Sequence, residues 1–304
     1  MSLKELIATE RIILTEGAVV ERLRREFSVP LDAHISNAGF IYDPKYRSVI
    51  RGIYRQYLNI GNAYNIPMMI FTPTWRANEE RVRSAGLIGQ NVNGDNFIFL
   101  AGLRSGYADY MNNIFIGGLI SSKGDCYKPQ EALSQGEAHR FHRYQLTALA
   151  DSGVDFLFAS TLPALSEATG IAMAMADTGL DYIISFVIRP AGTLLDGTPL
   201  SDAISFIDAA VSIKPLCYMT NCVHHSVLRS ALNIPLERLM GIQANTSAKS
   251  PEELDDMAEL ATEEPEIFAQ GMKKLHDDFG IKILGGCCGT DNRHIECLAK
   301  QLSV

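Results

Sequence analysis

Short apolar stretches recur along the chain, and each is followed by a turn and then by a longer segment with helical periodicity. The apolar stretches are rich in β-branched and aromatic residues and run almost without polar interruption, which is typical of parallel strands buried on both faces. We therefore predict eight strands, at residues 11–15, 66–72, 113–120, 154–160, 181–188, 215–221, 239–245 and 282–287.

The segments between these strands carry apolar residues at the spacing of amphipathic helices. They predict helices over 46–64, 78–86, 97–111, 130–151, 164–178, 201–212, 223–231 and, in two pieces, 252–278, with a last helix from about residue 291. Strands that alternate with helices in 304 residues predict an α/β protein, a single (β/α)₈ TIM barrel over residues 1–304. An open, doubly wound sheet is the alternative fold.

A barrel of this kind places its active site at the carboxyl ends of the strands. Cys222 closes the sixth predicted strand, and the adjacent Cys287 and Cys288 close the eighth. Strand ends of a closed barrel meet around one mouth, so the three thiols can converge there. Three sulfur ligands with a fourth position left open are the pattern of a catalytic zinc site. The flanking glycines Gly285, Gly286 and Gly289 permit the close backbone approach that such a turn needs.

Other interpretations of the cysteines stay open at this point. Cys222 alone would serve as a small buried apolar residue, and the Cys287–Cys288 pair would serve as a vicinal disulfide. Asn221, His224 and His225 flank Cys222 and are candidates for hydrogen bonds to the thiolates. The two histidines are also candidates for direct ligation. The remaining cysteines are expected to be structural: Cys126, Cys217 and Cys297.

Composition narrows the class of protein. The 27 basic and 35 acidic residues give a net charge of −8, which argues against a nucleic-acid-binding surface. No apolar run approaches the roughly 18–20 residues that span a bilayer, and the amino-terminal residues lack the features of a signal peptide. We therefore expect a cytoplasmic protein with no membrane or nucleic-acid partner. The segment after the first strand lacks a dinucleotide-binding fingerprint. The sequence leaves the oligomeric state open, a homo-oligomer included.

The stretch GGCCGTDNRHIECLA at 285–299 resembles the carboxyl-terminal signature of the homocysteine S-methyltransferase family, and Asn221-Cys222 is similar to that family's upstream Asn-Cys motif. The family includes betaine-dependent and S-methylmethionine-dependent enzymes and the homocysteine module of cobalamin-dependent methionine synthase. The resemblance extends over much of the chain, through residues 72–87, 141–168 and 241–247.

The resemblance implies a (β/α)₈ barrel in which Cys222, Cys287 and Cys288 bind one Zn²⁺ ion and activate a thiol. Metal coordination deprotonates a thiol whose pKa is ordinarily about 8.5. The thiolate then takes a methyl group from an onium or methyl-corrinoid donor, whose identity the sequence leaves open. The expected partners are thus a small-molecule thiol and a methyl donor. We expect the substrate-binding residues to be Glu16, Gly17, Arg76, Ser160, Thr161, Asn221, Asn245 and Gly286.

The chain departs from the family pattern at Met219, which replaces a glycine, and at two positions where the family has acids. In the family, two acids hold the ammonium group of homocysteine; the first is expected at Thr15, with Glu16 as a neighbouring substitute, and the second is Ser160 here. Loss of both charges would weaken binding of an α-amino acid, since a hydrogen bond to a charged group contributes roughly 1.5–3 kcal/mol. Arg76 and Arg189 follow predicted strands and would suit an anionic thiol instead.

Two other classes of protein are weighed against the transferase. A metal-dependent hydrolase would use histidine and carboxylate ligands, but the histidines do not fall in pairs at the strand ends. A non-enzymatic zinc-binding or thiol-sensing barrel would oxidise Cys287 and Cys288 reversibly. Metal analysis of cysteine variants separates the transferase from the sensor.

Overall fold

The computed structural model describes residues 2–303 apart from 10, 234–235, 250–252 and 254–261. Its parallel strands pair in chain order, and β1 also pairs with β8 through Ile13↔Ile283 and Leu14↔Leu284. This closure confirms the predicted (β/α)₈ barrel and excludes the open sheet. The strands are β1 Ile13–Thr15, β2 Met68–Phe71, β3 Ile114–Ile120, β4 Phe156–Leu162, β5 Tyr182–Phe186, β6 Cys217–His224, β7 Leu239–Asn245 and β8 Ile283–Gly286.

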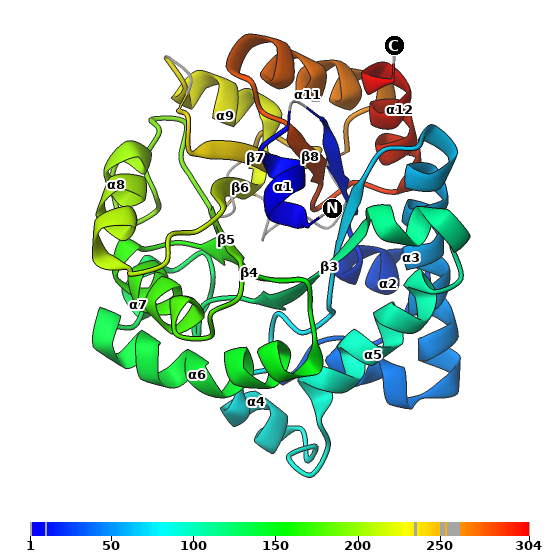
Figure 1. The fold of residues 1–304 in the computed structure, drawn as a ribbon, viewed down its shortest axis with the longest axis vertical. Coiled ribbons are helices and arrows are strands. Elements are labelled where there is room, and N and C mark those ends of the chain that lie inside the picture. The colour runs from blue at the N-terminus through cyan, green and yellow to red at the C-terminus, as the bar shows by residue number, and fades with distance from the viewer. Residues whose placement is uncertain (1, 10, 234–235, 250–252, 254–261, 304) are drawn as a thin grey trace.

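Helices surround the barrel (Figure 1), and most of them bury an apolar face in a core that they share with the strands. They are α1 Leu3–Ile7, α2 Val20–Arg25, α3 Pro44–Tyr64, α4 Glu79–Ser84, α5 Val92–Arg104, α6 Gln135–Ser152, α7 Leu165–Ala176, α8 Leu200–Ala210, α9 His225–Ala231, α11 Pro265–Phe279 and α12 Asn292–Leu302. Within the part of the chain that the structure describes, none of the helices has the length and apolar character needed to cross a membrane.

Some element boundaries differ from the predicted ones. The helix predicted at 97–111 begins earlier, at Val92, because the side chain of Asn91 accepts a hydrogen bond from the Gly94 N–H and caps it. It ends at Arg104, and a 3₁₀ turn follows at Ala108–Asn113. Most of the first piece of the helix pair predicted at 252–278 lies outside the described residues.

The sixth strand is longer than predicted, and this matters for the site. It runs on to His224, so Cys222 lies within β6 instead of after it, and α9 begins only at His225. The eighth strand ends at Gly286, and Cys287 follows it directly.

The short helix α1, which the sequence pattern did not predict, closes one end of the barrel. Leu3, Leu6 and Ile7 join the apolar side chains of the barrel interior, among them Met69 and Phe158. In Figure 1, α1 lies across the centre of the ring of strands. The Lys282 ammonium group, just before β8, donates to the main-chain oxygens of Ile7 and Thr9 and ties this helix to the amino ends of the strands. The candidate site therefore lies at the opposite end of the barrel, at the carboxyl ends of the strands.

Candidate active site

A cavity of about 410 Å³ opens at the carboxyl ends of the strands. Its wall combines the segment after β1, the loops after β2 and β3, and the ends of β4, β6 and β8. Most of the residues predicted from the sequence line it: Glu16, Gly17, Ser160, Thr161, Asn221, Cys222, Gly286, Cys287 and Cys288.

The three cysteines converge in this cavity as unpaired thiols. The Sγ atoms of Cys222 and Cys287 are 2.7 Å apart, and the Sγ atoms of all three lie within 4.8 Å of one another. Hydrogen bonds from Cys287 and, to a smaller extent, from Cys288 lower the pKa of Cys222 well below its usual value, although burial of the thiol acts in the opposite direction. The same contacts with Cys222 raise the pKa values of Cys287 and Cys288. The cluster by itself therefore stabilises one thiolate.

Cys222 is aimed into the cavity by an unusual backbone. Cys222 has a φ of +55°, and Thr161 on β4 has a φ of +58°. Left-handed conformations cost such residues about 1–3 kcal/mol each and persist only where the surroundings hold them. The side-chain amide of Asn221 holds both residues in place. Its oxygen accepts a hydrogen bond from the Thr161 N–H at 2.8 Å. Its nitrogen donates to the Thr161 hydroxyl at 2.6 Å and to the Cys222 sulfur at 3.3 Å. The Ser185 hydroxyl donates to the Asn221 oxygen at 2.7 Å and fixes the amide orientation.

The turn that carries Cys287 and Cys288 depends on its glycines. The Cys287 N–H donates to the Ala244 oxygen on β7, and the Cys288 oxygen accepts from the Thr246 N–H. A side chain on Gly289 would place its Cβ 1.8 Å from Thr246 Oγ1, and the Gly289 φ of +85° is itself unfavourable for other residues. The two thiols can face the cavity only because this turn stays narrow.

We expect Gly289→Ala to weaken metal binding and to destabilise the fold by about 1–3 kcal/mol, because the new methyl group overlaps Thr246 and the φ is strained. Metal affinity and thermal unfolding would be measured together. Gly52→Ala is the matched control, since Gly52 lies on α3 and a Cβ added there would meet no atom within 4 Å. The free energy of unfolding of Gly52→Ala should be about 0.5–1 kcal/mol higher than that of the wild type. Equal metal affinity in Gly289→Ala and the wild type would contradict this account of the turn.

Of the two neighbouring residues Thr15 and Glu16, only Glu16 lines the cavity, and it contributes a carboxyl group. The Thr15 side chain is fully buried and donates to the Glu16 main-chain oxygen. The Glu16 carboxylate lines the cavity and accepts a hydrogen bond from the Phe71 N–H at 2.9 Å. Burial raises the Glu16 pKa well above its ordinary value of 4.5, and the hydrogen bond from Phe71 offsets only part of that increase. The cavity that contains the three thiols thus also contains one carboxyl group, whose charged form a positively charged ligand would stabilise.

The raised pKa of Glu16 predicts a dependence of stability on pH. A carboxyl group whose pKa is raised by folding stabilises the protein below its unfolded pKa and loses that contribution as pH rises through the folded value. Glu16→Gln removes the buried charge and keeps an acceptor for Phe71. We therefore expect it to unfold at a higher temperature than the wild type at pH 8, by about 2–4 °C for each kcal/mol relieved, and at the same temperature near pH 4. Thermal unfolding across this pH range tests it; a lower Tm for Glu16→Gln at pH 8 would show that the charge is stabilised.

Other predicted residues lie away from the cavity. The Arg76 guanidinium stacks over the Trp75 ring at 4.3 Å and donates to the Gly124 oxygen, and neither Arg76 nor Arg189 lines the cavity. Asn245 is buried at the end of β7, also outside the cavity wall. Cys126, expected to be structural, does line the cavity, and burial raises its pKa to about 12.

The cavity also has residues that the sequence patterns did not single out. Tyr127, in the loop after β3, contributes a further hydrogen bond that lowers the Cys222 pKa. Asn37 is 1% exposed and lines the cavity, yet its side-chain nitrogen and oxygen have no hydrogen-bond partner among the described residues; the same holds for the Ser36 hydroxyl and the Trp75 indole nitrogen. Ser36, Asn37 and Tyr127 lie in loops without a motif, whereas Trp75 lies in the stretch 72–87 that resembles the family but was not singled out there.

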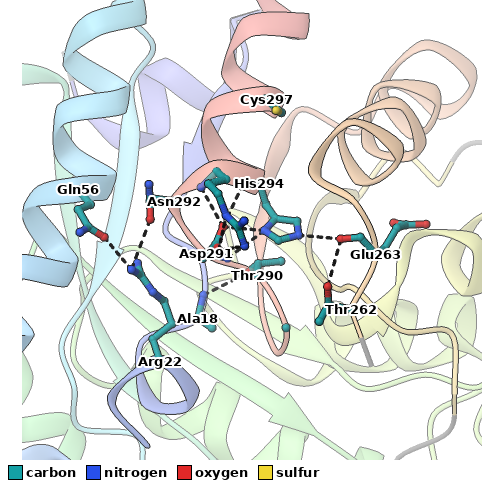
Figure 2. Close-up of polar contacts among 12 residues, drawn as sticks. Ala18, Arg22, Gln56, Thr262, Glu263, Thr290, Asp291, Asn292, His294 and Cys297 are labelled. Carbon is teal, nitrogen blue, oxygen red and sulfur yellow. Dashed lines mark hydrogen bonds and ion pairs between the residues drawn. The ribbon is translucent and has the colours of Figure 1, made fainter. Parts of the chain in front are cut away.

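His224 and His225 do not join the cysteines. The structure groups both with Glu263 in a separate cluster. Thr290, after the cysteine turn, instead links the turn to the start of the chain: its hydroxyl donates to the Cys287 oxygen and accepts from the Ala18 N–H, as Figure 2 shows for Ala18.

The cysteine cluster fits a zinc ion by the chemistry of its donors. The three sulfur atoms lie within 4.8 Å of one another, and the contact with Cys222 raises the pKa values of Cys287 and Cys288, so that a second and third thiolate need a nearby cation. A divalent ion compensates those charges, and zinc accepts three thiolates with one position open.

A (β/α)₈ barrel with a thiol-lined cavity at the carboxyl ends of its strands has the architecture of a barrel enzyme. The sequence profile of the homocysteine S-methyltransferase family matches residues 13–302. The chain therefore belongs to the homocysteine S-methyltransferase family and is a methyltransferase.

Individual relatives agree with this assignment. Homocysteine S-methyltransferase of Escherichia coli (strain K12) is 25% identical over 312 aligned residues, which cover 97% of each chain. Homocysteine S-methyltransferase YbgG of Bacillus subtilis (strain 168) is 27% identical over 60% of this chain, an alignment that spans 58% of the Bacillus protein. The crystal structure of the metallated form of the homocysteine methyltransferase MmuM from Escherichia coli has the same fold, with a TM-score of 0.75 at 20% identity over 98% of this chain and 99% of that one.

Proposed function

We propose that the chain transfers a methyl group from an onium donor to a zinc-activated thiol that carries an amino group, homocysteine or a close relative. The observation that carries this proposal is the convergence of the three cysteine sulfurs in a cavity that also contains the Glu16 carboxylate. In the reaction the methyl carbon forms a bond to the acceptor sulfur, and the electron pair of the broken bond stays with the donor. The acceptor's thiol proton is released.

Cys222, Cys287 and Cys288 would hold the metal. Zinc there would supply the positive charge that lowers the pKa of a substrate thiol, ordinarily about 8.5, into the neutral range. Asn221 and Thr161 keep the Cys222 sulfur in place, and the Tyr127 hydroxyl stays protonated beside it, because the negative charge of Cys222 and then burial raise the Tyr127 pKa well above its usual value.

Glu16 would receive the ammonium group of the acceptor. Ser160, at the position of the family's second acid, lines the same cavity and offers a neutral hydroxyl. One charge thus replaces two, which should weaken the acceptor's binding without removing selection for an amino group. The alternative acceptor, an anionic thiol without an amino group, has less support because Arg76 and Arg189 lie outside the cavity wall. Arg24 of α2 does line the cavity and suits the carboxylate of an amino acid.

The donor would bind against the aromatic side of the cavity. Trp75, Tyr54 and Phe158 line it, and ring faces attract sulfonium and quaternary ammonium groups. The unpaired amide of Asn37 and the indole nitrogen of Trp75 offer hydrogen bonds to polar groups of the same ligand. This lining is the reason to favour an onium compound over a methyl-corrinoid donor.

A matrix of donors and acceptors tests the proposal. Sulfonium and ammonium donors with isotopically labelled methyl groups would be combined with homocysteine and with a chain-matched thiol acid that lacks the amino group. We expect label transfer to homocysteine at a rate at least about tenfold above that to the thiol acid, corresponding to about 1.4 kcal/mol of discrimination. Equal transfer to both acceptors would overturn the amino-thiol part. No transfer to any thiol from either donor class, with zinc bound, would overturn the onium part.

A further inference from the structure

Two adjacent histidines stand where β6 passes into α9, outside the cysteine cluster. The rings of His224 and His225 are 3.9 Å apart between centroids and tilted by 37°. Both direct Nε2 at one carboxylate oxygen, Glu263 Oε2, at 3.4 Å from His224 and 3.1 Å from His225. Glu263 lies just before α11, so the cluster joins two neighbouring units of the barrel.

These separations fit a shared metal ion. Nitrogen and oxygen ligands at about 2.0–2.1 Å from a tetrahedral zinc ion lie about 3.4 Å from each other. The side chains of His224, His225 and Glu263 are 9%, 13% and 17% exposed, so the cluster is shielded but still reached by solvent. We propose that His224, His225 and Glu263 form a second metal site, for a divalent first-row transition-metal ion such as zinc or cobalt. This inference does not depend on the proposed methyl transfer.

The surroundings of His224 orient its ring for this role. Its Nδ1 lies 2.7 Å from the hydroxyl of Ser226 and accepts a hydrogen bond from the Ser226 N–H at 3.3 Å, which caps α9. A neutral imidazole that binds a metal through Nε2 carries its proton on Nδ1, so metal binding would replace this cap with a hydrogen bond from Nδ1–H to the Ser226 hydroxyl oxygen. Metal-binding histidines characteristically donate their other ring N–H in this way.

His225 is held by a glycine in the middle of a helix. A Cβ on Gly271 of α11 would lie 2.2 Å from Cε1 of His225. Glycine inside a helix is less favourable than alanine, and the close approach of the imidazole accounts for its presence here. The ring also meets the edge of Phe268, with centroids 6.4 Å apart.

Glu263 is anchored independently of any metal. Its main-chain oxygen accepts a hydrogen bond from His294 Nε2 at 3.0 Å, and His294 Nδ1 pairs with the Asp291 carboxylate at 2.8 Å. Figure 2 shows His294 between these two partners. The carboxylate therefore approaches the histidines from a fixed segment, and the ligand set is preorganised.

An ion pair alone explains the cluster less well. One imidazole suffices for a carboxylate, as His139 and Asp177 show on the surface with an Nε2–Oδ2 distance of 2.7 Å. Two charged imidazoles 3.9 Å apart would repel each other. Two neutral imidazoles and one carboxylate are instead a donor set for zinc, cobalt or nickel.

Titration of the metal-free full chain with Co²⁺ tests the second site. Cobalt at the cysteines gives thiolate-to-metal absorption, whereas cobalt at histidine and carboxylate ligands gives none. We expect two equivalents in the wild type, and one equivalent with full thiolate absorption in both His225→Ala and Glu263→Gln. The retained thiolate absorption also shows that these variants are folded. Wild-type saturation at one equivalent, or two equivalents in both variants, would overturn the proposal.

Two further variants sharpen the assignment. His139→Ala removes a histidine from a histidine–carboxylate pair that lacks a second imidazole and should leave both equivalents in place. Gly271→Ala keeps every ligand but displaces His225, so it should weaken the second equivalent about 10–100-fold while sparing the first. Unchanged affinity for the second equivalent in Gly271→Ala would contradict the role of His225.

Discussion

Replacing Cys287 by serine is expected to remove one zinc ion per chain and to abolish methyl transfer with it. The Cys287 sulfur lies 2.7 Å from the Cys222 sulfur, and Cys287 follows β8 directly, so it is one of the three proposed metal ligands. Serine remains protonated at neutral pH and leaves only two thiols in the cluster. Loss of a group that merely supports a ligand weakens metal affinity about 10–100-fold, and loss of the ligand itself should exceed about 100-fold. Elemental analysis and methyl-transfer assays measure the two effects.

Cys297→Ser is the matched control. Cys297 lies on α12, where its sulfur is 3.7 Å from Glu266, away from the cavity. It should keep wild-type zinc content and activity. Full zinc content together with full activity in Cys287→Ser would rule out the cysteine site. A wild-type chain that never binds zinc at the cysteines but oxidises them reversibly would favour the thiol-sensing barrel.

Replacing Glu16 by glutamine is expected to lower kcat/KM for an amino-thiol acceptor about 10–100-fold, which corresponds to the roughly 1.5–3 kcal/mol of a hydrogen bond to a charged group. The glutamine side chain would keep the acceptor for the Phe71 N–H, so the local backbone should remain in place. The loss should fall mainly on KM, because Glu16 would bind the ammonium group without taking part in the exchange of the methyl group. Steady-state kinetics with homocysteine over a range of concentrations measures it.

The thiol acid without an amino group is the control acceptor for this variant. Its kcat/KM should stay within about twofold of the wild-type value, since only the ammonium contact is lost. Ser160→Glu is the converse change, because it restores the family's second acid in the same cavity and should strengthen binding of the amino-thiol. Equal losses for both acceptors in Glu16→Gln would indicate that Glu16 supports the cavity and does not select the amino group.

The barrel could be predicted because each strand is a short apolar run buried on both faces, a pattern that survives in a single sequence. Helix α1 could not, because five residues show no periodicity and its apolar side chains are explained only by the barrel interior they fill. The extension of β6 to His224 was missed for a related reason. A bulged strand with a left-handed residue at Cys222 has no sequence signal that distinguishes it from a turn.

At the site, the cysteines were predictable from their positions at strand ends, but the first acid was not. Thr15 and Glu16 are neighbours, and which of them faces the cavity depends on how β1 packs. The Thr15 side chain fills the space next to Gly285, where an added Cβ would lie 1.9 Å from the Thr15 hydroxyl. Because Thr15 points to Gly285, the side chain of Glu16 points into the cavity. Tyr127 and Asn37 were missed because loop residues reach the cavity through tertiary contacts that no local pattern records.

Within the described residues, the filled interior and helix α1 close the barrel at the amino ends of its strands, so both proposed substrates would reach the cavity from the carboxyl ends. Two substrates that approach from the same side would obstruct each other, so binding of one should slow the entry of the other, and product-inhibition kinetics would reveal the order in which they bind.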